Sequence, residues 1–151
     1  MDGVIDDRAG KSIPRIFVEN GEDFFRDLES QILAEIAARG GRVVSTGGGV
    51  PIRVENRKIM QASGLIVRLS ASPELIHQRL VSSAPQRGRA IRPLLGDDAP
   101  IEKLRNMLDE REEAYAAASV TIDTERKSHD QVVEAIAEAW RSSGMAESDN
   151  R

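Results

Sequence analysis

The sequence predicts an α/β fold, in which a parallel sheet carries helices on both faces to give a three-layer αβα arrangement. Short β-prone runs at residues 42–46, 64–69 and 119–123 alternate with longer segments of helical periodicity. The intervals between these runs are long enough for helical crossovers between parallel strands. The run at 64–69 is also nearly continuous in apolar residues, as expected for a parallel strand that is covered on both faces.

One helix is indicated before the first β-prone run and another after the second. The first begins at Gly21 with apolar residues at helical spacing, and it ends at Gly40 and Gly41, where glycine adopts a left-handed cap at little cost. The second begins at Ser72 and Pro73, because serine is a good N-cap and proline suits the first helical position.

Two more helices flank the third β-prone run. Helical spacing returns over residues 100–115. The last helix begins near Ser128, and Gln131 stands three residues later in the spacing of a capping box. We expect this last helix to turn four apolar residues inward: Val132, Val133, Ile136 and Trp140.

Length and composition fit one compact domain. The chain has 151 residues, of which 40% are hydrophobic. We expect the domain to cover residues 1–141 and to include a mobile loop at 82–99, where arginines, glycines and prolines break the periodicity. The tail at 142–151 is predicted to be disordered.

Charge and residue content exclude several classes of function. The net charge of -4 argues against nucleic-acid binding driven by bulk charge, and no apolar stretch approaches the length of a membrane span. Cysteine is absent, so neither a disulfide framework nor a thiolate metal site is expected, and the cytoplasm is the expected location. His77 and His129 look like helix-surface residues, and we predict no metal ligand.

Four segments together are distinctive. Residues 10–29 fit the pattern G-x-S-I-x-x-I-F-x-x-x-G-E-x-x-F-R-x-x-E, and residues 46–49 form the glycine triplet Thr-Gly-Gly-Gly. Residues 92–95 read Arg-Pro-Leu-Leu, and Arg111 with Tyr115 gives R-x-x-x-Y. In these segments, at matching spacing, the chain resembles the shikimate kinase family from Asp2 to about Trp140.

The resemblance implies both a fold and an activity. The fold is a parallel sheet of the P-loop, nucleoside monophosphate kinase-like type. The activity is ATP-dependent phosphorylation of the shikimate 3-hydroxyl, a step of aromatic amino-acid biosynthesis in the chorismate pathway. Shikimate and ATP are the implied small-molecule substrates and Mg²⁺ the implied metal cofactor, with no nucleic acid or membrane partner. We expect a cytoplasmic, monomeric protein.

The resemblance also implies a substrate-binding site. Arg26 and Arg111 would act as two guanidinium forks for the carboxylate of shikimate, and Glu29, three residues after Arg26, would hold that fork in position. The simpler interpretations are a solvated helix-face arginine and an ordinary helical ion pair. Phe17 and Phe25 would wall the substrate ring, or else belong to the core.

The glycine triplet is the second part of the predicted site. Gly47, Gly48 and Gly49 follow a β-prone run, and glycine lets backbone N–H groups approach a polar substrate because no Cβ intervenes. Loops at the carboxyl ends of parallel strands are also where open α/β sheets bind ligands. A plain tight turn is the alternative interpretation.

Two residues are the candidates for catalysis. Asp2 falls at the second aspartate of the family's D-x-D motif, where it would orient the attacking hydroxyl or accept its proton, although an ordinary acidic N-terminus explains it equally well. Arg92 falls at the family's lid arginine and would contact ATP, stabilising charge on the transferred phosphoryl group. Arg126 and Lys127 lie where the family loop approaches adenine, but solvated loop charges are the better interpretation. Arg87 and Arg89 stay unassigned.

One motif is missing from the predicted mechanism. No G-x-x-x-x-G-K-[ST] occurs, and the Gly-Lys-Ser at 10–12 has neither the earlier glycine nor a strand ahead of it, so the phosphates of ATP have no cradle. The first strands and the first D-x-D aspartate are absent too, and Met1 falls on the middle position of that motif. We therefore expect an internal methionine taken as a start, or a truncation. The alternative function is a non-catalytic module that binds shikimate or a partner without turnover.

Overall fold

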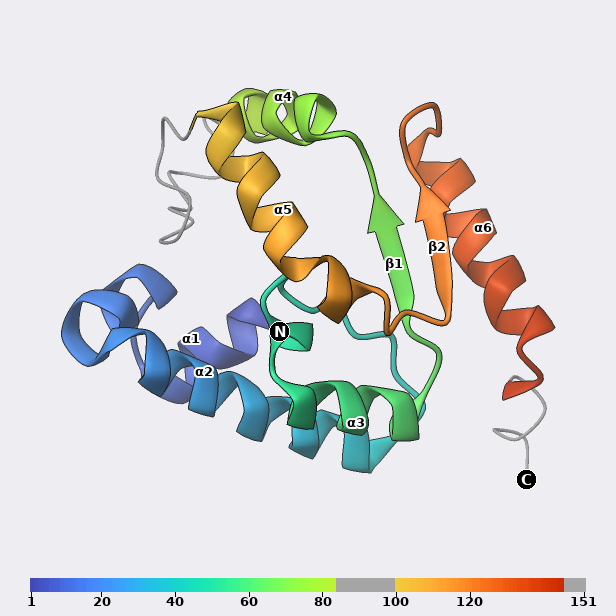
Figure 1. Cartoon of the computed structure of the whole chain (residues 1–151). Helices are drawn as coiled ribbons and strands as arrows, with labels where there is room; N and C mark the ends of the chain where they lie inside the picture. Colours follow the sequence, from blue (N-terminus) through green and yellow to red (C-terminus); the bar gives the residue numbers. More distant parts are fainter. Residues whose placement is uncertain (84–99, 146–151) are drawn as a thin grey trace. The chain divides into compact units, whose positions relative to one another are not determined.

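The computed structural model describes residues 1–83 and 100–145, which belong to two compact units (Figure 1). The first unit runs from Met1 to Gly64 and is built from helices. The second begins at Leu65 and contains both described strands. Within the described residues, no helix is both long enough and apolar enough to cross a membrane.

The first unit consists of three α-helices and a short 3-10 helix. Its elements are α1 (Asp2–Ala9), α2 (Ile13–Arg39), η1 (Val50–Ile52) and α3 (Val54–Ser63). Helix α1 packs against α2, and α3 packs against both α2 and η1. Five side chains form the buried core of this unit: Ile5, Ile16, Phe25, Leu28 and Ile32. The core therefore joins α1 to both ends of α2.

Helix α2 is broken at Gly21. This residue has φ 84° and ψ 173°, a backbone conformation that residues with a Cβ rarely adopt. In an unbroken helix, eight residues span about 12 Å along the axis. The rings of Phe17 and Phe25 are eight residues apart, yet their centroids lie 4.8 Å from each other. The break at Gly21 is what allows both rings to reach the same core, and the helix predicted from Gly21 to Gly40 is confirmed as the second part of α2.

The second unit contains the parallel sheet. Strands β1 (Val67–Ser70) and β2 (Val120–Asp123) pair in parallel, with Val67 opposite Val120 (Figure 1). The helices of this unit are α4 (Pro73–Ser83), α5 (Ile101–Tyr115) and α6 (His129–Ser142). The α/β class, the parallel pairing and the predicted strands at 64–69 and 119–123 are thus confirmed. Leu69, however, is 55% exposed, so the described residues do not cover β1 on both faces.

The predicted helix starts are also confirmed. Ser72 Oγ accepts a hydrogen bond from the backbone N–H of Leu75 at 3.3 Å. At the start of α6, Ser128 and Gln131 form a reciprocal capping box, which satisfies two backbone donors that the helix leaves open. The inward face predicted for α6 is partly wrong, because Val133 is 64% exposed and Trp140 36%. A helical period predicts which residues share a face, but it does not predict how much of that face a neighbour covers.

Two features of the first unit differ from the sequence predictions. Residues 42–46 form no strand, and Val43 is fully exposed. A β-prone run becomes a strand only beside a partner strand, and the described residues provide none for this run. Helix α1 was not predicted, yet it exists and its Ile5 is completely buried. The predicted loop at 82–99 and the predicted tail lie mostly outside the described residues, and the single-domain boundaries stay a prediction.

The break at Gly21 predicts an effect on stability. We expect Gly21→Ala to lower the free energy of unfolding by about 1–3 kcal/mol, because alanine must adopt a positive φ there. A Cβ at this position meets nothing within 4 Å, so the cost is one of backbone conformation rather than of a clash. Urea denaturation measures it.

Gly3→Ala is the matched control for this prediction. Gly3 also has open space around it, but it lies inside α1 without a positive φ, so alanine is expected to leave stability unchanged or to raise it slightly. Equal effects of the two substitutions would contradict the role assigned to Gly21.

Candidate functional site

Arg26 is the central residue of the candidate site. It lies on α2 between two core residues, Phe25 and Leu28, and is only 9% exposed. Its Nη1 donates a hydrogen bond to Glu29 Oε2 at 2.8 Å, while Nε and Nη2 donate to Glu22 Oε1 at 3.3 and 3.2 Å. The predicted pairing of Arg26 with Glu29 is therefore confirmed, and the interpretation of Arg26 as a solvated helix arginine is wrong.

Glu29 is the buried partner in this pair. It is 3% exposed, and burial raises the pKa of its carboxyl group. The hydrogen bond and positive charge of Arg26 lower that pKa, the nearby charge of Asp2 raises it, and the charge of Arg53 lowers it. The net direction is upward, so loss of water outweighs the stabilisation that Arg26 gives to the charged form.

The glycine triplet forms a fixed turn in the same unit. The backbone N–H of Val50 donates to the carbonyl of Gly47 at 3.2 Å, and that of Ile52 donates to the carbonyl of Gly49 at 3.1 Å. The turn is held from α3 as well, because the buried Asn56 donates from Nδ2 to the carbonyl of Val50 at 2.9 Å. The triplet therefore leads directly into η1 with little freedom to move.

The structure brings the triplet and the Arg26 pair together. A Cβ placed on Gly49 would meet the guanidinium of Arg26, and one placed on Gly47 would come within 3.7 Å of Glu29 Oε1. Two segments that lie more than 15 residues apart in the sequence thus share one site. Phe17 and Phe25 line the core next to it, as the simpler interpretation of these aromatic residues predicts.

Asp2 is the first residue of α1 and is exposed. Helix α1 is anchored by the buried Ile5, and the amino group of Met1 donates to the carbonyl of Ser45 at 2.9 Å. Asp2 lies close enough to Glu29 for its charge to raise the pKa of that residue. The predicted acid is thus held in an ordered helix near the Arg26 pair.

Arg111 belongs to the second unit. It lies on α5 beside Glu112, whose carboxylate receives two hydrogen bonds from Arg68 of β1, at 2.8 and 2.7 Å. The guanidinium of Arg68 also stacks over the ring of Tyr115, 5.2 Å from its centroid. These contacts fix α5 on the strand. Among the described residues no ion pair is found for Arg111, and its convergence with Arg26 stays a prediction.

The described residues do not fit the phosphates of ATP. Gly10 ends α1 in a left-handed conformation, and Ser12 precedes α2, so no strand leads into this Gly-Lys-Ser. The amine of Lys11 donates hydrogen bonds to Glu19 at 2.8 Å and to Asn20 at 2.5 Å, both of which lie on α2. The sequence match to a phosphate loop is therefore a coincidence, as predicted.

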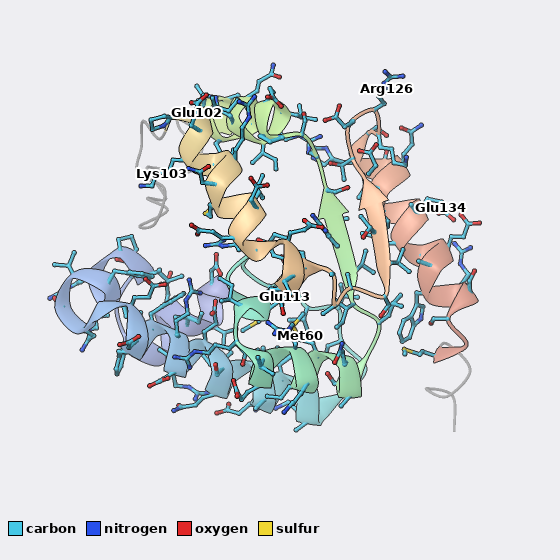
Figure 2. The ribbon with its side chains drawn as sticks, in the orientation of Figure 1. Met60, Glu102, Lys103, Glu113, Arg126 and Glu134 are labelled. Carbon is cyan, nitrogen blue, oxygen red and sulfur yellow. The ribbon has the colours of Figure 1, made fainter. Side chains whose placement is uncertain are left out.

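Other predicted residues lie apart from this site or beyond the description. Arg126 is on the exposed loop after β2, and Figure 2 shows its side chain pointing away from the ribbon. This agrees with a solvated loop charge. Arg92, with Arg87 and Arg89, lies outside the described residues.

Comparison with known proteins assigns the chain to a family. The sequence model of the family described as shikimate kinase matches residues 1–141. The chain belongs to the shikimate kinase family. A shikimate kinase of Geobacter sulfurreducens is 42% identical over 137 residues, which cover 91% of this chain and 72% of the relative. One of Desulforudis audaxviator is 38% identical, with 97% and 74% covered.

Solved structures agree with this assignment. A shikimate kinase from Acinetobacter baumannii in complex with shikimate matches with a TM-score of 0.82 and 32% identity, covering 94% of this chain and 76% of that one. The enzyme from Aquifex aeolicus matches with a TM-score of 0.74 and 26% identity, covering 95% and 79%. The fold is thus that of the shikimate kinases, as predicted, and the activity of the family is phosphoryl transfer.

Sequence reasoning missed two parts of this candidate site. Glu22 also binds Arg26, and its i, i+4 spacing was a usable signal. The contact between Gly49 and Arg26 had no such signal, because it joins residues that only the folded turn brings together.

The buried carboxyl group predicts a pH dependence of stability. Because the pKa of Glu29 is raised, the folded chain holds this proton to a higher pH than the unfolded chain. The free energy of unfolding therefore falls as pH rises above 4.5, the ordinary value, and stops falling above the folded pKa. Glu29→Gln removes this titration. We expect the stability difference, wild type minus Glu29→Gln, to fall over that interval in urea denaturation at a series of pH values. A difference that rises there would contradict the prediction.

Proposed function

We propose that the chain binds shikimate through Arg26 and Arg111 and that its function is phosphorylation of the shikimate 3-hydroxyl by ATP. The observation that carries this proposal is the buried Arg26, held by Glu29 and Glu22 in a member of the shikimate kinase family. A relative of the same fold was solved in complex with shikimate. Shikimate carries a carboxylate, and two arginine forks suit such a group.

The hydrogen-bond inventory of Arg26 supports this role. A guanidinium has five N–H donors. Within the described part of the chain, Arg26 uses three of them, one toward Glu29 and two toward Glu22, which leaves two for a ligand. Because the guanidinium is fixed before the ligand arrives, little side-chain freedom is lost on binding. Gly47, Gly48 and Gly49 add backbone N–H groups at the same turn.

Two residues are proposed for the chemical step. Asp2 orients the substrate hydroxyl or accepts its proton, and its position on an ordered helix close to Glu29 supports this role. Arg92 stabilises charge on the transferred phosphoryl group. Mg²⁺ is proposed as the metal partner of ATP. The cytoplasmic location, the monomeric state and the lack of nucleic acid or membrane partners stay predictions.

A second function is favoured by one observation. The 151 residues contain no G-x-x-x-x-G-K-[ST], and Lys11 is engaged by Glu19 and Asn20. These residues alone therefore suit a module that binds shikimate or a partner without turnover. Measurements of shikimate binding and of turnover distinguish the two functions, because binding depends on Arg26 and Arg111 and not on a phosphate loop.

Shikimate binding is the first test. We expect the 151-residue chain to bind shikimate, and Arg26→Ala or Arg111→Ala to weaken the affinity by about tenfold to a hundredfold, since a hydrogen bond to a charged group contributes about 1.5–3 kcal/mol. Calorimetry with the intact chain measures this. Arg126→Ala is the control, because that side chain lies on an exposed loop. An unchanged affinity in Arg26→Ala would remove Arg26 from the site.

Turnover is the second test. We expect no ATP-dependent phosphorylation of shikimate by these 151 residues alone, and activity once a strand and phosphate loop are joined ahead of residue 1. Even one charge-stabilising arginine contributes about 10³ to 10⁵ in the rate of such reactions, so we expect 151 residues that contain no phosphate-loop motif to show no turnover. A coupled assay with contaminating kinase excluded measures this, and near-normal turnover by the 151 residues would overturn the expectation.

A further inference from the structure

Gly49 is a glycine whose backbone does not require one. Its φ of -88° and ψ of -19° lie in the right-handed helical region, which every L-residue adopts readily. The residue is buried and is the N-cap of η1. The reason for glycine at this position therefore lies in its surroundings and not in its conformation.

The surroundings of Gly49 are filled by Arg26. An ideal Cβ at position 49 would lie 2.7 Å from both Cζ and Nη2 of Arg26, and closer still to Nη1. Real Cβ atoms essentially never approach another heavy atom within 3.0 Å. A Cβ at Gly47, by contrast, would make only an ordinary contact with Glu29 Oε1, at 3.7 Å. Of these two glycines, Gly49 is the one whose bare Cα is needed by the guanidinium.

We propose that Gly49 is a positioning residue for Arg26. Because Gly49 has no side chain, the guanidinium has room to lie next to the turn and to reach Glu29. A residue with a Cβ at position 49 expels the guanidinium from this seat and so weakens binding of the substrate carboxylate. The last step rests on the proposed function of Arg26, whereas the seat itself does not.

The fold is expected to survive the loss of this seat. The atoms that a Cβ would meet are the far end of a long, flexible side chain, so Arg26 yields more easily than the backbone does. When Arg26 moves, Glu29 loses its 2.8 Å hydrogen bond and the positive charge that lowers its pKa. The charge of Asp2 still raises that pKa, and the charge of Arg53 still lowers it. The pKa of Glu29 therefore rises further, which can be observed without any ligand.

The test compares Gly49→Ala with two control variants of the full 151-residue chain. The pKa of the Glu29 carboxyl is followed by NMR, and the dissociation constant for shikimate by calorimetry. We expect Gly49→Ala to raise the pKa of Glu29 and to weaken shikimate binding by about tenfold or more. Gly47→Ala is the control for the pKa: it adds a Cβ beside the Glu29 carboxylate without displacing Arg26, so we expect it to raise the pKa of Glu29 less than Gly49→Ala does. Gly64→Ala is the control for affinity, because its extended backbone and open surroundings accept a side chain.

Each outcome of this test is decisive. An unchanged pKa of Glu29 in Gly49→Ala overturns the seat. A raised pKa with unchanged shikimate affinity, where Arg26→Ala does weaken binding, overturns its role in positioning. If the wild-type chain binds no shikimate while the pKa still rises, the proposed function fails and the seat stands.

A double-mutant cycle keeps the proposal testable if Gly49→Ala folds poorly. Arg26→Ala removes the group with which the new Cβ would clash, so we expect Gly49→Ala to cost little extra stability in the Arg26→Ala background. Unfolding of Gly49→Ala that Arg26→Ala does not relieve would show that the clash involves something other than Arg26, and it would overturn the proposal.

Discussion

The buried ion pair between Arg26 and Glu29 is the interaction on which the candidate site depends. Taking two charges out of water is costly, and such a pair often stabilises a protein no better than apolar residues of the same size. Removing one partner, however, leaves a buried charge alone and costs about 3–5 kcal/mol. The pair therefore adds little net stability, yet the loss of either partner is costly, so both side chains stay in place. A guanidinium with two spare donors, held in this way, is suited to binding an anion.

The core of the first unit explains why Arg26 lies where it does. Phe25 and Leu28 are buried on the inner face of α2, and the residue after each of them, Arg26 and Glu29, is buried with it. Asp27, which lies between the two apolar residues, is exposed. The break at Gly21 lets Phe17 fold back onto Phe25, which closes the core next to the site. Helix α1 adds Ile5 to that core and so brings Asp2 toward Glu29. The geometry of the charged groups thus follows from ordinary apolar packing.

Local signals in the sequence predicted a large part of this structure. Capping residues such as Ser128 and Gln131 depend only on their neighbours in the chain, and their helix starts are where the sequence predicts them. The i, i+3 pair of Arg26 and Glu29 was predictable for the same reason. Residues 42–46 were not predictable in this way, because a strand depends on a partner that lies elsewhere. Helix α1 was missed because Ile5 is its one buried residue, so this acidic segment shows no apolar periodicity.

The glycine triplet shows where sequence reasoning reaches its limit. A single argument, close approach of the backbone to a ligand, was applied to all three glycines, because three identical residues give no basis for separating them. The coordinates of Arg26 and Glu29 do separate Gly47 from Gly49. A Cβ at Gly47 would touch a carboxylate at an ordinary distance, whereas at Gly49 it would occupy the place of a guanidinium. What distinguishes the two positions is thus which side chain of α2 lies next to each of them. The function of such a glycine depends on the residue that occupies the space where a Cβ would lie.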